Sequence, residues 1–303
     1  MKQYLYALGA IFCWASLPVA TGSGLVGLSS EELMFFSFTS AAVYLYLQDV
    51  ILTRSFSVFI PDLKITLLGI WGIFLYHYIY YLALDRAPLA EGAILATTWS
   101  FWIVVFSSLI LFRKLKMAIL ITALAGMCGA ALVISSGKDL SFGMEYMGGY
   151  LLALACGIIW SSFSVAIGHV KIKREPMTIF TIYAALLSAV LYLVTMPHDL
   201  PPAPSLLAAI YLGCVPLGLS FFLWNRALTG GNMVIIGFLS YLTPPLAVVM
   251  VALIHGEKVP VQVLLGMVVI IAAAIGGKLS LTAEKKSIKT RYQEEVDERN
   301  GND

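Results

Sequence analysis

Charged side chains are scarce in this chain. Of its 303 residues, 12% are Asp, Glu, Lys or Arg, 60% are hydrophobic, and the mean hydropathy is +0.89. A soluble domain carries about 25% charged residues, so this chain has too few charges to cover a water-facing surface. Its apolar runs are about 20 residues long, which is the length of a membrane-spanning helix rather than of a barrel strand. The sequence therefore predicts an all-α polytopic membrane protein.

Sequence motifs for metal, nucleotide or nucleophilic chemistry are missing. The chain has no GxxxxGK[ST], HExxH or CxxC motif and no nucleophile elbow. Its four cysteines all lie inside apolar runs without metal-type spacing, so they are expected to be small buried hydrophobic residues. We expect no cofactor, no metal, no nucleic-acid partner and no catalytic residues, and an ATP-driven pump would need a nucleotide-binding domain that is not here.

Carboxylates are missing from the middle of the apolar runs. The acidic residues nearest to them stand at run ends: Asp49, Asp85, Glu91, Glu145 and Glu257. Proton antiporters and pumps for cationic drugs usually place a carboxylate at mid-membrane depth, so both are disfavoured here. Aromatic ring faces could still hold a cation. His77 is the one titratable residue besides Tyr and Cys well inside a run, and it is either a proton carrier or a hydrogen-bonded structural histidine.

What the sequence does have is ten apolar runs, separated by short segments rich in Pro, Gly, Asn or charge. With loops this short, we expect no soluble domain. The predicted spans are about 4–22, 33–52, 63–84, 89–112, 116–135, 147–168, 177–196, 204–225, 232–254 and 261–281.

The first five spans resemble the last five. Residues 4–16 (YLYALGAIFCWAS) and 150–162 (YLLALACGIIWSS) share six of thirteen positions, including Trp14 with Trp160. LDRA at 84–87 is echoed by WNRA at 224–227. We predict two five-helix repeats, residues 1–137 and 138–283, followed by a disordered cytoplasmic tail, 284–303. Because five is odd, the second repeat must enter the membrane upside down, and such inverted repeats are typical of secondary transporters.

The placement of basic residues supports this topology. Of the 19 Lys and Arg residues, ten even crossings put 16 on the side of the amino terminus and three, Arg86, Lys138 and Lys258, on the other. Basic loops stay in the cytoplasm. We therefore expect both termini to be cytoplasmic, and we expect a multi-pass protein of the bacterial-type inner membrane.

An aromatic stripe marks the third span and the start of the fourth. On a regular helix Trp71, Phe74, His77, Tyr78, Tyr81 and Asp85 share one face, and Trp99 and Trp102 share another. The stripe is either the wall of a cavity or part of the aromatic belts at the membrane surfaces. A mid-span Trp needs a partner for its indole N–H, which adds Trp14 and Trp160 as candidates. Pro216, Pro244 and Pro245 could free carbonyl groups near Tyr241, or could make static bends. The predicted substrate-binding residues are Trp14, His77, Tyr78, Tyr81, Trp99, Trp102, Trp160 and Tyr241.

Two segments carry a family resemblance. ALDRAPLAEGA (83–93) and YLTPPLAVVMVALIHGEKVPVQVLLG (241–266) resemble the EamA-type branch of the drug/metabolite transporter superfamily. The first repeat departs from the pattern, because Ser100 and Phe101 stand where a proline is expected and Arg113 replaces a Glu. The aromatic third and fourth spans look like those of the aromatic amino-acid exporters of the YddG type. The resemblance implies ten helices in two inverted repeats and transport of small solutes.

From these observations we predict a secondary transporter that exports small amphipathic solutes, above all aromatic or neutral amino acids, by alternating access. Its partners would be the solute and the lipid bilayer, and a monomer would suffice. A multidrug or purine-type exporter on the same fold is the first alternative. A non-transport membrane scaffold, an enzyme or a channel is the second.

Overall fold

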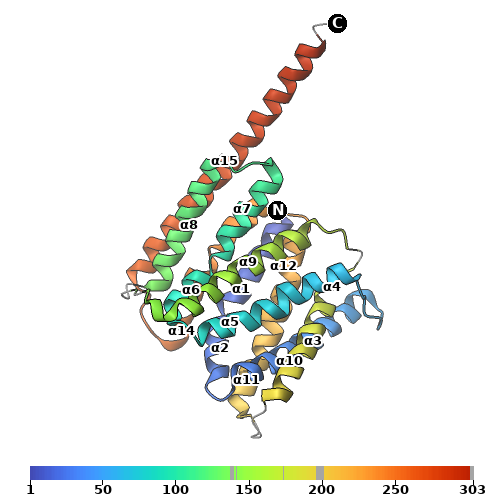
Figure 1. Ribbon diagram of the computed structural model, residues 1–303, viewed down its shortest axis with the longest axis vertical. Coiled ribbons are helices and arrows are strands. Elements are labelled where there is room, and N and C mark those ends of the chain that lie inside the picture. Colours follow the sequence, from blue (N-terminus) through green and yellow to red (C-terminus); the bar gives the residue numbers. More distant parts are fainter. Residues whose placement is uncertain (137–139, 141, 173, 196–200, 301–303) are drawn as a thin grey trace.

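The computed structural model describes residues 1–136, 140, 142–172, 174–195 and 201–300 (Figure 1). These residues form helices and loops and contain ten helical segments long and apolar enough to cross a membrane. The predicted all-α class and the number of spans are confirmed. We number the spans one to ten in chain order.

Each span consists of one, two or three helical pieces. Those of the first half are α1 (Lys2–Ala15) with α2 (Leu17–Leu25), α3 (Ser30–Thr53), α4 (Leu63–Gly69) with η1 (Ile70–Leu75) and α5 (Tyr76–Leu84), α6 (Leu89–Ala96) with α7 (Trp99–Phe112), and α8 (Met117–Ser135). Those of the second half are η2 (Met144–Tyr146) with α9 (Met147–His169), α10 (Met177–Thr195), α11 (Ala203–Leu212) with η3 (Gly213–Leu219) and α12 (Ser220–Leu228), α13 (Met233–Ser240) with α14 (Thr243–His255), and α15 (Val261–Asn300).

The two halves are broken at equivalent places. Spans three and eight each contain a π-helical segment, η1 and η3, and spans four and nine each break after one short helix. Spans four and nine also end alike, with Arg113 and Gly256 in the left-handed conformation at φ 57° and 69°. Arg113 therefore adopts the backbone role for which glycine is preferred.

The main helix contacts join a span of one half to a span of the other half. Span two packs on span seven (α3 on α10), span five on span ten (α8 on α15) and span four on span nine (α7 on α13). Span one packs on span eight (α1 on α12), and its counterpart, span six, packs on span three (α9 on α5). This pattern maps onto itself when the halves are swapped, which supports the predicted repeat. The inversion and the boundary between the repeats stay predictions.

Glycine permits the close approach of helices at the π-helical segments. A Cβ on Gly72 would lie 2.0 Å from Cγ of Phe163, and one on Gly213 would lie 2.2 Å from the carbonyl oxygen of Ser37. No side chain fits at either distance. The π-helical turns of spans three and eight therefore lie directly against spans six and two.

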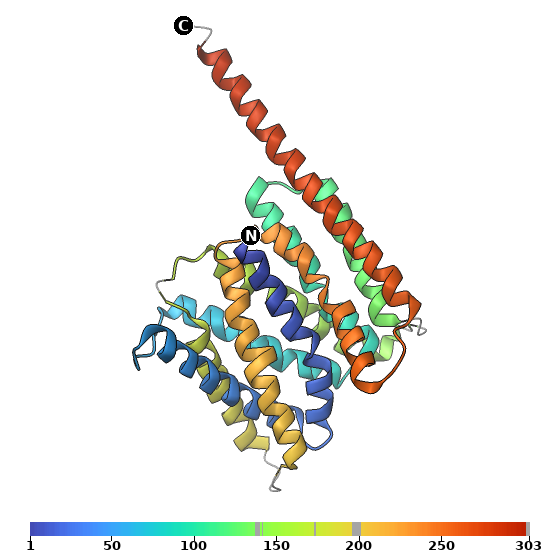
Figure 2. The same ribbon diagram turned by 180° about the vertical axis from the view of Figure 1, so that it is seen from behind.

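Helices α8 and α15 form a pair at one side of the bundle, and α15 continues far beyond it (Figures 1 and 2). Its 40 residues span about 60 Å at 1.5 Å per residue, twice the hydrocarbon thickness of about 30 Å. Residues 284–300, for which we predicted a disordered tail, thus continue α15 as helix. Lys116 Nζ, at the N-cap of α8, forms an ion pair with Glu284 and so joins the start of this extension to α8.

Candidate functional site

Four tryptophans from four spans meet at the centre of the bundle. We call Trp14 (α1), Trp99 (α7), Trp160 (α9) and Trp224 (α12) the tryptophan cluster. The centroid of the Trp14 ring lies 4.9 Å from that of Trp224, 5.6 Å from Trp160 and 5.7 Å from Trp99. Trp99 lies 6.5 Å from Trp160 and 6.0 Å from Trp224. All four are buried. The indole rings therefore contact each other and fill the centre in this structure.

The four residues of the tryptophan cluster differ in the hydrogen bonding of their indole N–H groups. The indole N–H of Trp224 donates to Ser164 Oγ over 3.1 Å. Within the part of the chain that the structure describes, the indole nitrogens of Trp14, Trp99 and Trp160 have no hydrogen-bond partner. Three N–H groups are thus available to a polar ligand that enters between the rings.

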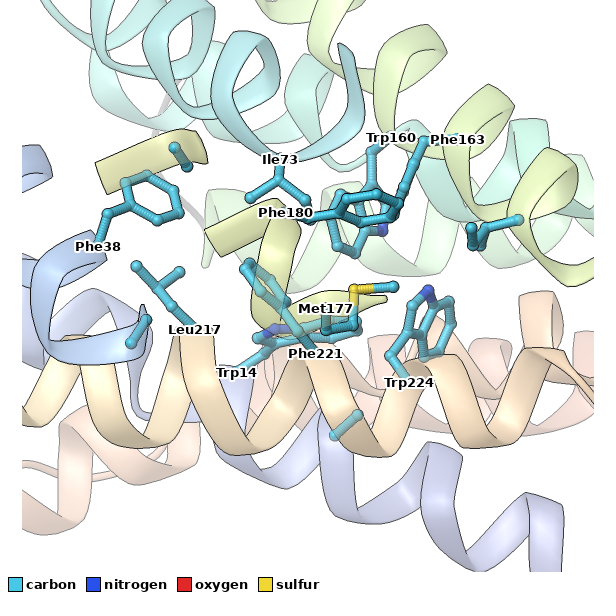
Figure 3. Packing of buried hydrophobic residues seen from close by; sticks show 14 of the residues in the cluster. Trp14, Phe38, Ile73, Trp160, Phe163, Met177, Phe180, Leu217, Phe221 and Trp224 are labelled. Atoms are coloured by element: carbon cyan, nitrogen blue, oxygen red, sulfur yellow. The ribbon is translucent and has the colours of Figure 1, made fainter. Parts of the chain in front are cut away.

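Further aromatic side chains surround the tryptophan cluster. The ring of Trp160 lies 5.2 Å from Tyr76, 5.6 Å from Phe163 and 5.8 Å from Phe221. Figure 3 shows Trp14 of α1, Trp160 of α9, and Phe221 and Trp224, both of α12, gathered in one packed region. Aromatic pairs at such separations stabilise one another beyond the area they bury. The same ring faces and edges could stack on a flat apolar solute.

A cavity of about 390 Å³ opens at one end of the same helices. Its lining comes from the ends of α7, α9 and α12, from the loop 229–232 and from the start of α13: Ser107, Ile110, Leu111, Gly168, His169, Leu228, Thr229, Gly230, Gly231, Asn232, Met233 and Val234. Three of the tryptophan-bearing helices therefore also line the cavity. The basic loops place this end on the predicted cytoplasmic side.

The aromatic stripe predicted for span three does not keep one face. The π-helical turn of η1 shifts the side chains that follow it. His77 is buried, its Nδ1 lies 2.7 Å from the carbonyl oxygen of Ile73, and its ring packs edge-on against Phe38 at 5.0 Å. Because a carbonyl oxygen accepts, Nδ1 carries the proton. The structure thus places His77 in the packed core, as the structural alternative expected.

The remaining predicted residues lie at different places. Tyr81 is buried in the core cluster that contains the tryptophan cluster, and Tyr78 stacks on Phe74 at 6.1 Å. Trp102 is half-buried and contacts Phe106 at 5.6 Å. Trp71, exposed over 41% of its surface, donates to Ser162 Oγ over 3.0 Å.

Tyr241 lies in a separate core between α8, α13 and α15. Its hydroxyl donates to the carbonyl oxygen of Ala123 over 2.8 Å, and 1% of its surface is exposed. The structure therefore brings together Trp14, Trp99 and Trp160 among the predicted residues and keeps Tyr241 apart from them. The role of each in substrate binding stays a prediction.

Sequence reasoning missed Trp224. The predicted eighth span, 204–225, put Trp224 at its end, so the criterion of a mid-span tryptophan that selected Trp14 and Trp160 passed it over. In the structure its N–H is buried and hydrogen-bonded. Trp224 also follows Pro216 and Ser220 at four-residue steps, so one face of the helix would carry all three.

A polar network joins the ends of three spans on the predicted cytoplasmic side. Glu175, in the loop before α10, accepts from Asn225 Nδ2 over 2.7 Å, and one of its carboxylate oxygens lies 3.6 Å from Arg226 Nε. Burial raises the pKa of the Glu175 carboxyl to about 7, although Arg226 opposes the shift. The neighbouring Arg174 pairs with Asp49 of α3 over 3.1 Å. Residues 174 and 175 thereby link spans two and eight.

Comparison with known proteins agrees with this architecture. The sequence profile of the EamA-like transporter family matches residues 1–135 and, a second time, residues 147–276. The chain belongs to the EamA-like transporter family. The double match agrees with an internal duplication, and each matched segment contains five spans or nearly all of them.

Individual proteins similar to this chain include two transporters and one solved structure. An aromatic amino acid exporter, YddG of Ancylobacter novellus, is 31% identical over 245 residues, which cover 80% of this chain and 85% of the relative. An uncharacterized transporter of Bacillus subtilis, YdfC, is 23% identical over 92% of each chain. A crystal structure that is 28% identical superposes with a TM-score of 0.81 over 92% of this chain and 98% of the other. As a member of this family the chain is a multi-pass membrane transporter of small molecules.

Proposed function

We propose that this transporter exports aromatic and other neutral amino acids by alternating access. The observation that carries the proposal is the tryptophan cluster, in which four rings from four spans meet and three indole N–H groups lack a partner among the described residues. When an aromatic solute separates the indoles, the contacts between indole rings are replaced by contacts between the indoles and the ring of the solute. Its polar groups gain the three free donors. The similarity to a named aromatic amino acid exporter supports the same class of solute.

The repeated architecture supplies a route for the solute. Two similar five-helix units around a central site can tilt into two states, each open to one side of the membrane. The breaks in spans one, three, four, eight and nine give each unit places to bend. We place the protein in a bacterial-type inner membrane with both termini in the cytoplasm, because 16 of its 19 basic residues then face the cytoplasm.

Flux of radiolabelled Phe or Trp tests the proposal. The purified protein is reconstituted in liposomes, and flux is measured with and without a pH gradient against protein-free liposomes. We expect saturable flux of both amino acids, and an effect of the gradient would reveal coupling to protons. No flux under either condition would end the amino-acid proposal. A thermal-shift screen with purines and cationic drugs then identifies an exporter of the alternative kind, and flux that does not saturate identifies a channel.

A further inference from the structure

We infer that the cavity at the ends of α7, α9 and α12 is an entry site, in which the carboxylate of the solute binds before the solute reaches the tryptophan cluster. The inference rests on the proposed function, since it assumes that the solute is an amino acid. It concerns a second site, on the predicted cytoplasmic side, with its own set of residues.

The cavity has the size and the two-sided chemistry of a site for an amphipathic solute. Its volume of about 390 Å³ lies within the usual range of about 300–1,000 Å³ for small-molecule sites. Ile110 and Leu111 of α7 form an apolar side, while Thr229 and Asn232 and the glycines between them bring polar groups. Among the described lining residues none is acidic, so nothing there repels a carboxylate.

The amino-terminal end of α13 supplies donors for an anion. This helix of eight residues begins at Met233, and the side chain of its N-cap residue, Asn232, accepts from the N–H of Ile235 over 3.3 Å. The N–H groups of Met233 and Val234, both in the cavity lining, have no acceptor in the described part of the chain. Free N–H groups and the positive end of the helix dipole together favour a carboxylate at this place.

Ser107 points to the same ligand independently. Ser107 is a lining residue of the cavity, 4% of its surface is exposed, and its enclosed Oγ has no hydrogen-bond partner among the described residues. A hydroxyl is seldom left unpaired when buried, because the loss of its hydrogen bond to water is costly. A carboxylate in the cavity would accept from Ser107 as well as from the start of α13.

The cavity lining also offers an acceptor for the ammonium group of an amino acid. Nδ1 of His169 lies 2.8 Å from the carbonyl oxygen of Val165 and must donate to it. In the neutral ring, Nε2 is then an acceptor, which suits an ammonium group. The acceptor, the donors and the apolar residues thus all belong to the lining of one cavity.

The cavity lies on the way to the tryptophan cluster. Ser107 and Trp99 are eight residues apart on α7, or about 12 Å along the helix. Gly168 and Trp160 have the same separation on α9, and Leu228 follows Trp224 by about one turn. A solute held at the cavity therefore has to move two helical turns to reach the rings.

Two neighbouring serines give a matched test. Ser107→Ala removes the unpaired hydroxyl of a residue in the cavity lining. Ser108→Ala removes one that is equally buried and unpaired but lies outside the lining. Uptake of Phe and of phenylalaninamide, which keeps the ring and the ammonium group but lacks the carboxylate, is measured in inside-out membrane vesicles. We expect Ser107→Ala to raise the KM for Phe about tenfold, the loss of one charge-assisted hydrogen bond. The KM for the amide should change less than twofold, and Ser108→Ala should change neither.

The outcomes separate the entry site from the proposed function. If wild-type vesicles take up Phe but Ser107→Ala and Ser108→Ala give the same KM, the entry site is wrong and the exporter function stands. If wild-type vesicles take up no Phe, the exporter function itself fails. Thermal stabilisation of the detergent-purified variants by Phe gives a second readout. Weaker stabilisation of Ser107→Ala than of Ser108→Ala supports the entry site even where flux is low, and equal stabilisation contradicts it.

Discussion

The indole N–H of Trp224 donates to Ser164 Oγ over 3.1 Å and so joins helix α12 to helix α9. Trp224 also has the closest ring contact in the tryptophan cluster, 4.9 Å to Trp14. One hydrogen bond therefore holds the ring against which another span packs.

Replacing Ser164 by Ala should destabilise the protein. The indole N–H of Trp224 would stay buried without an acceptor, at a cost of about 1–3 kcal/mol. Thermal unfolding in detergent measures the loss. Ser161→Ala is the matched control, because the hydroxyl of Ser161 is also fully buried on α9 but donates within its own helix, to Ile158. Equal losses in the two variants would contradict the role of Ser164.

Replacing Trp14 or Trp160 by Phe should raise the KM for Trp and Phe in the liposome assay. Each change keeps an aromatic ring but removes an N–H that has no partner in the described structure, so binding weakens about fivefold to tenfold. Stability should fall as well, because both indoles are buried and the smaller ring leaves a cavity. An unchanged KM in both variants would count against the tryptophan cluster as the substrate site.

Tyr241→Phe should lower stability and leave the KM unchanged. Its hydroxyl donates to the carbonyl oxygen of Ala123, and its ring is enclosed by α8, α13 and α15, so the loss should be about 1 kcal/mol. Comparison with Trp14→Phe in the same two assays decides the matter. A raised KM for Tyr241→Phe with normal stability would restore Tyr241 as a substrate ligand.

Glu175 should make stability depend on pH. Because the pKa of its carboxyl is raised from 4.5 to about 7 in the folded protein, the folded state holds the proton more tightly than the unfolded state. Stability is therefore greatest below about pH 4.5 and falls as the pH rises through about 7, by at most about 3 kcal/mol.

In Glu175→Gln the side chain cannot ionise, so the stability of the variant should depend less on pH. Thermal unfolding at pH 5 and at pH 8 measures it, with Glu257→Gln at an exposed position as the control. The Asn225 amide and Arg226 remain beside the new side chain in the variant. If wild type and Glu175→Gln lose the same stability between the two pH values, Glu175 is not the titrating group.

Gly72→Ala should disturb the contact of span three with span six. The added methyl group would meet the ring of Phe163 at 2.0 Å, and such overpacking costs about 1–3 kcal/mol. Gly22→Ala, at which the added carbon meets nothing within 4 Å, should be neutral or stabilising by up to about 1 kcal/mol. Thermal unfolding of the pair shows whether close approach, rather than helix propensity, decides the effect.

The spans could be predicted from the sequence because hydrophobic length is a local property. The predicted first span, 4–22, compares with Lys2–Leu25 in the structure, and the predicted fourth, 89–112, agrees at both ends. The internal echo of residues 4–16 and 150–162 also paired Trp14 with Trp160, and in the structure their ring centroids lie 5.6 Å apart.

The site could be predicted only in part, because side-chain direction depends on helix register. The π-helical turn of η1 changes the number of residues per turn, so His77 packs against Phe38 and Phe221 rather than joining Tyr78 on one face. No feature of the sequence of residues 70–75 predicts that π-helical turn. Tyr241 lies apart from the tryptophan cluster for a related reason, since the direction of its ring depends on the break between α13 and α14.

The tryptophan cluster gives the protein an optical probe of its own. It holds four of the chain's six tryptophans, with centroids between 4.9 and 6.5 Å apart, while Trp71 and Trp102 lie elsewhere. Indoles this close couple their electronic transitions. Any movement that parts the four helices must alter the near-ultraviolet circular dichroism and the intrinsic fluorescence. Solute passage could thus be followed in the unlabelled protein.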